Sequence, residues 1–228
     1  VLVGQESSSY RVNGEIPVIP LESFSDEVAS AMEDVSQKME EQDLYLNSSP
    51  GYWLRTFDRW ADCEEFIGFP LNNPLEKSSL LETANYFAIA QDAETLNEES
   101  QRHCAVALQG NIKGELQHVT IDTGYLMGPI RIQMTVSLYP EGSGMEPGTG
   151  GSWNGEAEFE ITSGVTGEGI PYTLVVSETP ESDYYNDFSS ADAYFVLKNG
   201  LYTLDAVSPG RDSGADAKAA LEELLALF

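Results

Sequence analysis

The chain has 228 residues and carries 38 acidic against 11 basic side chains, which gives a formal net charge of −27. This balance argues against nucleic acid or an anionic membrane as the main partner, because phosphate binding needs a basic surface. Hydrophobic residues make up 41% of the chain, too many for a disordered protein. No apolar run approaches the ~18 residues of a membrane-spanning helix, so no membrane insertion is predicted within this chain.

The start of the chain predicts an extended segment. Residues 1–22 are mixed in character and include Pro17 and Pro20, which suits a lead-in with one edge strand at most. Residues 23–228 predict a single domain. Because the first residue is Val1, we interpret the chain as the processed product of an exported protein, with removal of a tag from a cytosolic protein as the alternative. The expected location is therefore extracytoplasmic.

Three segments repeat apolar residues with the 3.6-residue period of an amphipathic helix. The first spans about residues 25–41, with Ser25 as its N-cap. The second spans about 58–67, and Gly68 is well placed to end it. The third spans about 214–227. Their apolar positions are Val28, Met32, Val35, Met39, Trp60, Phe66, Ile67, Ala217, Ala220, Leu221, Leu224, Leu225 and Phe228.

Between these helices the hydrophobic period changes to two, which is typical of strands with one buried face. The clearest strand covers residues 130–138, and 156–161 alternates in the same way. One apolar and one polar face per strand indicates an antiparallel sheet. We therefore predict an α+β fold in which helices cover an antiparallel sheet. Shorter strands are predicted at residues 52–57, 86–90, 104–108 and 172–176.

Asn199 and Gly200 form the dipeptide that best suits a two-residue hairpin turn. A turn centred on this pair places Leu197 opposite Tyr202. The same register sets Phe195 against Leu204 and Ala193 against Ala206, which gives one apolar face.

The two cysteines, Cys63 and Cys104, allow a single disulfide, or they are two separate buried thiols. The pattern does not decide between these readings. A zinc site that adds His103 and His118 requires three separate segments to converge. We therefore expect a surface histidine beside a buried cysteine.

The common catalytic motifs fail in detail. Residues 150–154 carry asparagine where the nucleophile elbow needs its second glycine. Residues 142–147 lack the last glycine of a phosphate-binding loop. Acidic pairs such as Glu158 and Glu160 are most simply the solvated face of a strand. The sequence thus predicts no catalytic residue and no cofactor.

A calcium site is one hypothesis for the acidic segment near residue 185. Asp183, Asp187 and Asp192 could hold Ca²⁺ through carboxylates and nearby carbonyls. Their spacing differs from the ordered spacing of an EF-hand loop. An ordinary polar loop is the alternative.

Aromatic residues in expected loops suggest a second type of site. Trp153, Tyr184 and Tyr185 could form a stacking platform for a sugar or a peptide. Loop aromatics also commonly cap the edge of a core, which is the alternative reading. Trp53 and Trp60 lie in patterned elements and are assigned to the core.

Residues 52–71 form an aromatic and acidic helical segment that ends in Gly-x-Pro-Leu, and residues 193–204 and 221–228 form a closing hairpin and a leucine-rich helix. These segments cover roughly a fifth of the chain. They resemble extracytoplasmic domains of Gram-positive membrane-anchored regulators of the anti-sigma type. The resemblance implies a domain of the cell envelope and rests on packing motifs.

The expected function is that of a non-catalytic sensory or ligand-binding domain of a cell-envelope protein, with a protein, peptide or glycan as its partner. One alternative is a secreted module that binds a sugar or a peptide. Another is a hydrolase that uses two carboxylates, for which the carboxyl groups should lie about 5–10 Å apart across a cleft.

Overall fold

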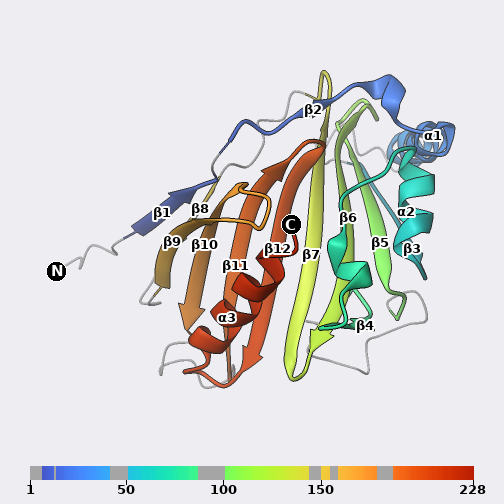
Figure 1. Ribbon diagram of the computed structural model, residues 1–228. Coiled ribbons are helices and arrows are strands. Elements are labelled where there is room, and N and C mark those ends of the chain that lie inside the picture. The colour runs from blue at the N-terminus through green and yellow to red at the C-terminus, as the bar shows by residue number, and fades with distance from the viewer. Residues whose placement is uncertain are drawn as a thin grey trace.

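The structure is a computed structural model that describes residues 7–12, 14–41, 51–86, 101–143, 150–154, 159–178 and 187–228 (Figure 1). Its strands are β1 (Ser7–Arg11), β2 (Val18–Ile19), β3 (Gly51–Phe57), β4 (Glu82–Ala84), β5 (Cys104–Gly110), β6 (Leu116–Met127), β7 (Ile130–Pro140), β8 (Gly150–Asn154), β9 (Phe159–Val165), β10 (Pro171–Glu178), β11 (Phe188–Leu197) and β12 (Gly200–Pro209). Its helices are α1 (Asp26–Glu41), α2 (Trp60–Ile67) and α3 (Gly214–Leu225), with the 3₁₀ turns η1 (Leu21–Ser23) and η3 (Pro74–Lys77).

Most strands belong to one large sheet with the order β3-β5-β6-β7-β12-β11-β10-β9, in which all neighbours are antiparallel. Two short strands extend it, because β4 pairs with β6 and β2 pairs in parallel with the end of β7. Strands β1 and β8 form a separate antiparallel pair.

The predicted α+β fold is wrong, although the three predicted helices are all present. The described chain is mostly one antiparallel sheet with three short helices, closer to all-β than to α+β. The physical reason lies in strands such as β6 and β12. Polar residues such as aspartate, threonine and histidine on one face interrupt the apolar residues of the other. A short stretch of the sequence therefore does not reveal that these strands are 12 and 10 residues long.

One face of the large sheet packs against the helices and forms the core. Helix α3 covers β10, β11 and β12, whereas α1 and α2 cover β3 and β5 (Figure 1). Val136 at the centre of β7 lies opposite Ile121 on one side and Tyr202 on the other. The alternation predicted for β7 is confirmed by the complete burial of Ile132, Met134, Val136 and Leu138. Each such side chain contributes about 1.5–3 kcal/mol to folding.

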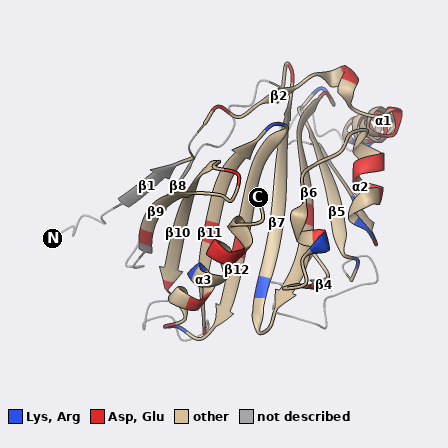
Figure 2. Cartoon of the chain, viewed as in Figure 1, with Lys and Arg blue, Asp and Glu red and all other residues tan. Residues whose placement is uncertain are grey.

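The opposite face of the same strands carries polar side chains. Asp122 on β6 lies opposite Thr135 on β7, and the Thr135 hydroxyl donates a hydrogen bond of 2.5 Å to its carboxylate. Gln133 donates a second hydrogen bond to the same oxygen over 3.3 Å. Figure 2 shows that acidic residues gather on the helices and near the ends of strands, while most of the sheet is uncharged.

The β11–β12 hairpin exists, but its turn lies one residue earlier than predicted. Leu197 pairs with Gly200, so the turn residues are Lys198 and Asn199. Gly200 belongs to β12, where an added Cβ would lie 2.7 Å from the Ser137 carbonyl oxygen. Each residue of β11 therefore pairs with a β12 residue two positions earlier than predicted, so Phe195 lies opposite Tyr202 and not Leu204. The same side chains still form the apolar face.

Other strand predictions have mixed outcomes. The strands at 52–57, 104–108, 130–138 and 172–176 are confirmed within β3, β5, β7 and β10. Residues 87–90 and 155–158 lie outside the described residues. Ile161 was expected to face the core, yet it is 38% exposed on β9.

Within the described ranges, no helix combines the length and the apolar character needed to cross a membrane.

Candidate functional site

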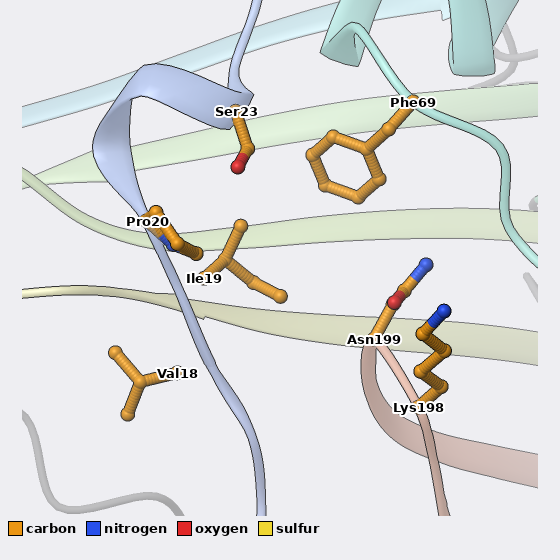
Figure 3. A pocket seen from close by; sticks show the side chains of 7 residues that line it. All are labelled: Val18, Ile19, Pro20, Ser23, Phe69, Lys198 and Asn199. Atoms are coloured by element: carbon orange, nitrogen blue, oxygen red, sulfur yellow. The ribbon is translucent and has the colours of Figure 1, made fainter.

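A pocket of about 290 Å³ opens between the N-terminal segment, the turn after α2 and the tip of the β11–β12 hairpin (Figure 3). Its size is close to the lower end of ordinary small-molecule sites, which enclose about 300–1,000 Å³. Most of its wall is apolar, and a few polar groups enter from opposite sides. The lining residues are Val18, Ile19, Pro20, Ser23, Phe69, Lys198 and Asn199.

The wall contributed by α2 is fixed by Ser25. Its hydroxyl oxygen accepts a hydrogen bond of 3.2 Å from the Val28 amide, as the predicted N-cap of α1 should. The same hydroxyl donates a hydrogen bond to the Phe66 carbonyl at the end of α2. The Ser25 amide donates to the Ile67 carbonyl over 3.0 Å. One residue therefore joins the start of α1 to the end of α2.

Gly68 turns the chain from α2 into the pocket wall. It ends the helix as predicted, with a left-handed φ of +101°. An added Cβ would lie 2.7 Å from the Ser25 nitrogen, so both the conformation and the space require glycine. The next residue, Phe69, packs edge-on against Phe24 with 5.5 Å between ring centroids. The turn thus holds the Phe69 ring beside the pocket (Figure 3).

The remaining walls come from β2 and from the hairpin tip. Ile19 lies beside the end of β7, and its carbonyl accepts a hydrogen bond of 2.8 Å from the Glu141 amide. Asn199 donates a hydrogen bond of 3.2 Å from its side-chain amide to the Pro70 carbonyl. The hairpin tip is therefore tied to the turn that carries Phe69, across 129 residues of sequence.

Lys198 supplies the only charged side chain that lines this pocket in the described structure. Among the described residues no carboxylate lies within ion-pair distance of its ammonium group. Several other basic groups do have acidic partners; Lys218, for example, contacts Glu160 at 2.8 Å. In a chain with 38 acidic residues, a lysine that faces an apolar pocket without an acidic partner is available to an anionic ligand.

The three proposed calcium ligands do not form a site among the described residues. Asp183 lies outside them, so the complete set stays a prediction. Asp187 is 83% exposed and contacts Arg211 at 3.9 Å. Asp192 lies on β11, directly opposite Asp205 of β12. In the part of the chain that the structure describes, no group of three or more acidic, cysteine or histidine side chains is arranged to hold a metal ion.

The proposed aromatic platform also stays a prediction. The backbone of Trp153 belongs to β8, opposite Ser8 of β1, and nothing is described of its side chain. Tyr184 and Tyr185 lie outside the described residues. Trp60 is 5% exposed and belongs to the core as predicted, and Trp53 stacks on Phe66 with 5.0 Å between ring centroids.

A carboxyl pair on the polar face of the sheet was not anticipated from sequence. Asp192 and Asp205 lie directly opposite each other on β11 and β12. Burial, and after it the neighbouring Asp192, raise the pKa of Asp205 to about 9. Burial likewise raises the pKa of Asp192 and of Asp122 two strands away. The predicted register hides this pair, because it sets Tyr194 opposite Asp205.

A second polar cluster surrounds His103, whose side chain is only 9% exposed and is therefore not the surface histidine that was expected. His103 contacts Glu76 at 2.6 Å, and the Tyr125 hydroxyl donates to the same carboxylate over 2.9 Å. Desolvation lowers the pKa of His103, but hydrogen bonds with Cys104 and Glu76 outweigh it and raise the pKa to about 10. His118 lies elsewhere and stacks on Tyr139.

Sequence reasoning missed the pocket because its residues come from three distant segments. Ile19 and Phe69 look like ordinary apolar positions, and Lys198 looks like the last strand residue before the predicted turn. The signal that was present is a lysine beside the predicted hairpin turn of a strongly acidic chain. No family model, curated protein or solved structure matches this chain.

Proposed function

We propose that this chain is a non-catalytic ligand-binding domain whose pocket takes a small amphiphilic anion, namely an aliphatic chain that ends in a carboxylate. The observation that carries the proposal is the combination of an apolar wall with the ammonium group of Lys198 at one side (Figure 3). Ile19 and Phe69 offer apolar contact. Lys198 offers a charge-assisted hydrogen bond, which is stronger than a neutral one.

Two further polar groups suit the same ligand. The Ser23 hydroxyl and the Asn199 amide both line the pocket and can donate hydrogen bonds to a carboxylate oxygen. The pocket walls are held together by hydrogen bonds between backbone and side chains, so little conformational freedom is lost on binding. A ligand of about ten non-hydrogen atoms should then bind with a Kd of roughly 10 µM to 1 mM.

Calorimetric titration with octanoate tests this proposal. We expect saturable binding of octanoate, and binding at least about tenfold weaker for octanol, which lacks the charge. Lys198→Gln should remove most of the difference between the two ligands. Val18→Ser should weaken the binding of octanoate and of octanol equally, because Val18 is 56% exposed and lines the apolar wall without supporting the core.

Lys113→Gln is the matched control. Lys113 is another exposed lysine without an acidic partner among the described residues, and it does not line this pocket. Its loss changes the net charge by the same amount and should leave both affinities unchanged. Equal octanoate binding by the wild type and Lys198→Gln, or no saturable binding at all, contradicts the proposed ligand class.

We place this function at the cell envelope, outside the cytoplasm. The supports are the strong negative charge and the resemblance of residues 52–71 and 193–204 to envelope regulators. Subcellular fractionation of the producing cell, followed by immunodetection, tests the location. Recovery in the cytoplasmic fraction alone contradicts it.

The carboxylate-dependent hydrolase finds less support in the described structure. Asp192 and Asp205 lie directly opposite each other on neighbouring strands, and burial raises the pKa of both, so this pair is buried on the sheet and not set across a cleft. Glycoside hydrolysis needs carboxyl groups about 5–9.5 Å apart. We therefore retain the binding function as the proposal, and assay of the chain on glycan substrates is the test of the alternative.

A further inference from the structure

A second pocket, of about 280 Å³, lies between the end of β3, the start of α1 and helix α2. It shares no lining residue with the pocket beside Lys198. Most of its lining side chains are charged, in contrast to the apolar wall of the first pocket. The charged residues are Glu27, Arg55, Asp58, Asp62, Glu65 and Arg102.

The two signs of charge in this second pocket come from different elements. The guanidinium groups belong to the sheet, because Arg55 lies on β3 and Arg102 comes two residues before the neighbouring strand β5. Most of the carboxylates belong to the helices: Glu27 lies in the first turn of α1, and Asp62 and Glu65 lie on α2, whose acidic residues Figure 2 shows. A pocket built in this way complements a ligand that itself carries both signs of charge.

Both guanidinium groups are held in place by the end of β3. Arg102 donates a hydrogen bond of 3.0 Å from Nη1 to the Thr56 carbonyl. The guanidinium carbon of Arg55 lies 5.2 Å from the centroid of the Phe57 ring, which is the geometry of a cation–π contact. The two positive groups are therefore fixed by the same strand end that lines the pocket.

Neither guanidinium group is hydrogen-bonded to a carboxylate among the described residues. Arg55 lies 4.0 Å from Glu27, and Arg102 lies 3.8 Å from Asp58. Both distances are too long for a hydrogen bond. A guanidinium group has five N–H donors, so each arginine keeps donors that a carboxylate of a ligand can use.

The remaining carboxylates leave the pocket with a negative charge. Asp62 is already neutralised by Arg59, which donates to its two carboxylate oxygens from Nε over 3.0 Å and from Nη2. The other three carboxylates, of Glu27, Asp58 and Glu65, exceed the two guanidinium groups by one charge. A ligand with one net positive charge restores the balance.

We propose that this second pocket binds a free α-amino acid with a basic side chain, of the lysine type. The α-carboxylate accepts hydrogen bonds from Arg55 and Arg102, and the two ammonium groups donate to Glu27, Asp58 and Glu65. Lysine has about ten non-hydrogen atoms, which suits a pocket of about 280 Å³. This inference stands on the second pocket alone and does not depend on octanoate binding.

Calorimetric titration of the full chain with L-lysine tests the inference. A salt concentration of about 0.15 M screens the general attraction between a cation and an acidic protein. We expect saturable binding with a Kd of roughly 10 µM to 1 mM. L-Norleucine lacks the side-chain ammonium group, and 1,5-diaminopentane lacks the carboxylate. Each should bind at least about threefold more weakly than L-lysine.

Two variants assign the groups of the ligand to the two sides of the pocket. Arg55→Gln should weaken lysine binding roughly 3–10-fold, and should not weaken the binding of 1,5-diaminopentane, which has no carboxylate. Glu65→Gln should weaken the binding of both ligands. Arg55 and Glu65 are exposed, so both variants should fold, and thermal melting followed by circular dichroism verifies this.

Lys113→Gln and Glu223→Gln are the matched controls. Both residues are exposed and do not line the pocket, and each change alters the net charge by the same amount as the corresponding test variant. Both controls should bind lysine as the wild type does. The inference is overturned by the absence of saturable lysine binding or by equal affinities for lysine and either analogue. An unchanged lysine affinity in Arg55→Gln overturns it as well.

Discussion

Asp192 on β11 lies directly opposite Asp205 on β12, and burial raises the pKa of both carboxyl groups. Burial raises the pKa of Asp205 to about 9, far above the ordinary value near 3.8. Neighbouring Arg131 lowers it by a smaller amount. The pair therefore holds a proton at neutral pH that the unfolded chain releases.

This retained proton makes stability depend on pH. Between about pH 4 and pH 9 the native state binds one more proton at Asp205 than the unfolded state does. Its stabilising contribution is thus complete near pH 4 and is lost as the pH rises toward 9. We expect Asp205→Asn to be more stable than the wild type at pH 8, by about 1–3 kcal/mol, and to show a smaller loss of stability from pH 5 to pH 8.

Guanidinium unfolding of both proteins at pH 5, 6.5 and 8 measures the difference. Asp187→Asn is the matched control, because Asp187 is 83% exposed and should leave the pH dependence unchanged. Parallel pH profiles for the wild type and Asp205→Asn would show that the pair ionises normally.

The pKa of His103 should lie above the ordinary histidine value of 6.5, and the pKa of His118 should lie below it. The bonds of His103 to Cys104 and Glu76 overcome desolvation and raise its pKa, whereas burial lowers the pKa of His118. Glu76→Gln should bring the pKa of His103 down by at least about one unit. Proton NMR of the imidazole signals against pH measures both groups, with His118→Asn to assign them. Coincident titrations near pH 6.5 would contradict this electrostatic picture.

Trp60 anchors α2 on the sheet and is 5% exposed. Trp60→Ala should destabilise the protein by about 3–5 kcal/mol and lower its thermal midpoint by roughly 10 °C. The buried Nε1–H of Trp60 has no hydrogen-bond partner among the described residues. Trp60→Phe removes this group while it keeps most of the ring, so its cost should stay below about 2 kcal/mol. Thermal melting followed by circular dichroism distinguishes the two variants, and an unchanged midpoint for Trp60→Ala would refute the core assignment.

A comparison of Gly68 with Gly169 separates the cost of a left-handed backbone conformation from the cost of a steric clash. Both have positive φ, but an added Cβ at Gly68 lies 2.7 Å from the Ser25 nitrogen, whereas one at Gly169 meets no atom within 4 Å. Gly169→Ala should cost about 1–2 kcal/mol from conformation alone. Gly68→Ala should cost about 2–4 kcal/mol and should also weaken octanoate binding, because it displaces Phe69. Equal unfolding free energies of the two variants, measured in guanidinium, would show that the contact with Ser25 does not matter.

The sequence by itself determined the local elements of this protein. Helix α1 has an apolar face and is capped by Ser25, and α2 ends at Gly68. These features depend on residues only a few positions apart, so they can be predicted from the local sequence. The alternation of β7 specified one buried face for the same reason. The predicted fold class was wrong because polar residues on one face of the sheet interrupt the apolar pattern of the long strands.

Only the tertiary structure decided what these elements bring together. The hairpin turn lies at Lys198 and Asn199 because Gly200 must fit against the Ser137 carbonyl, and that one-residue shift sets Asp192 against Asp205. The pocket joins segments near residues 19, 69 and 198. Such contacts arise from strand register and helix packing, which depend on the whole chain at once.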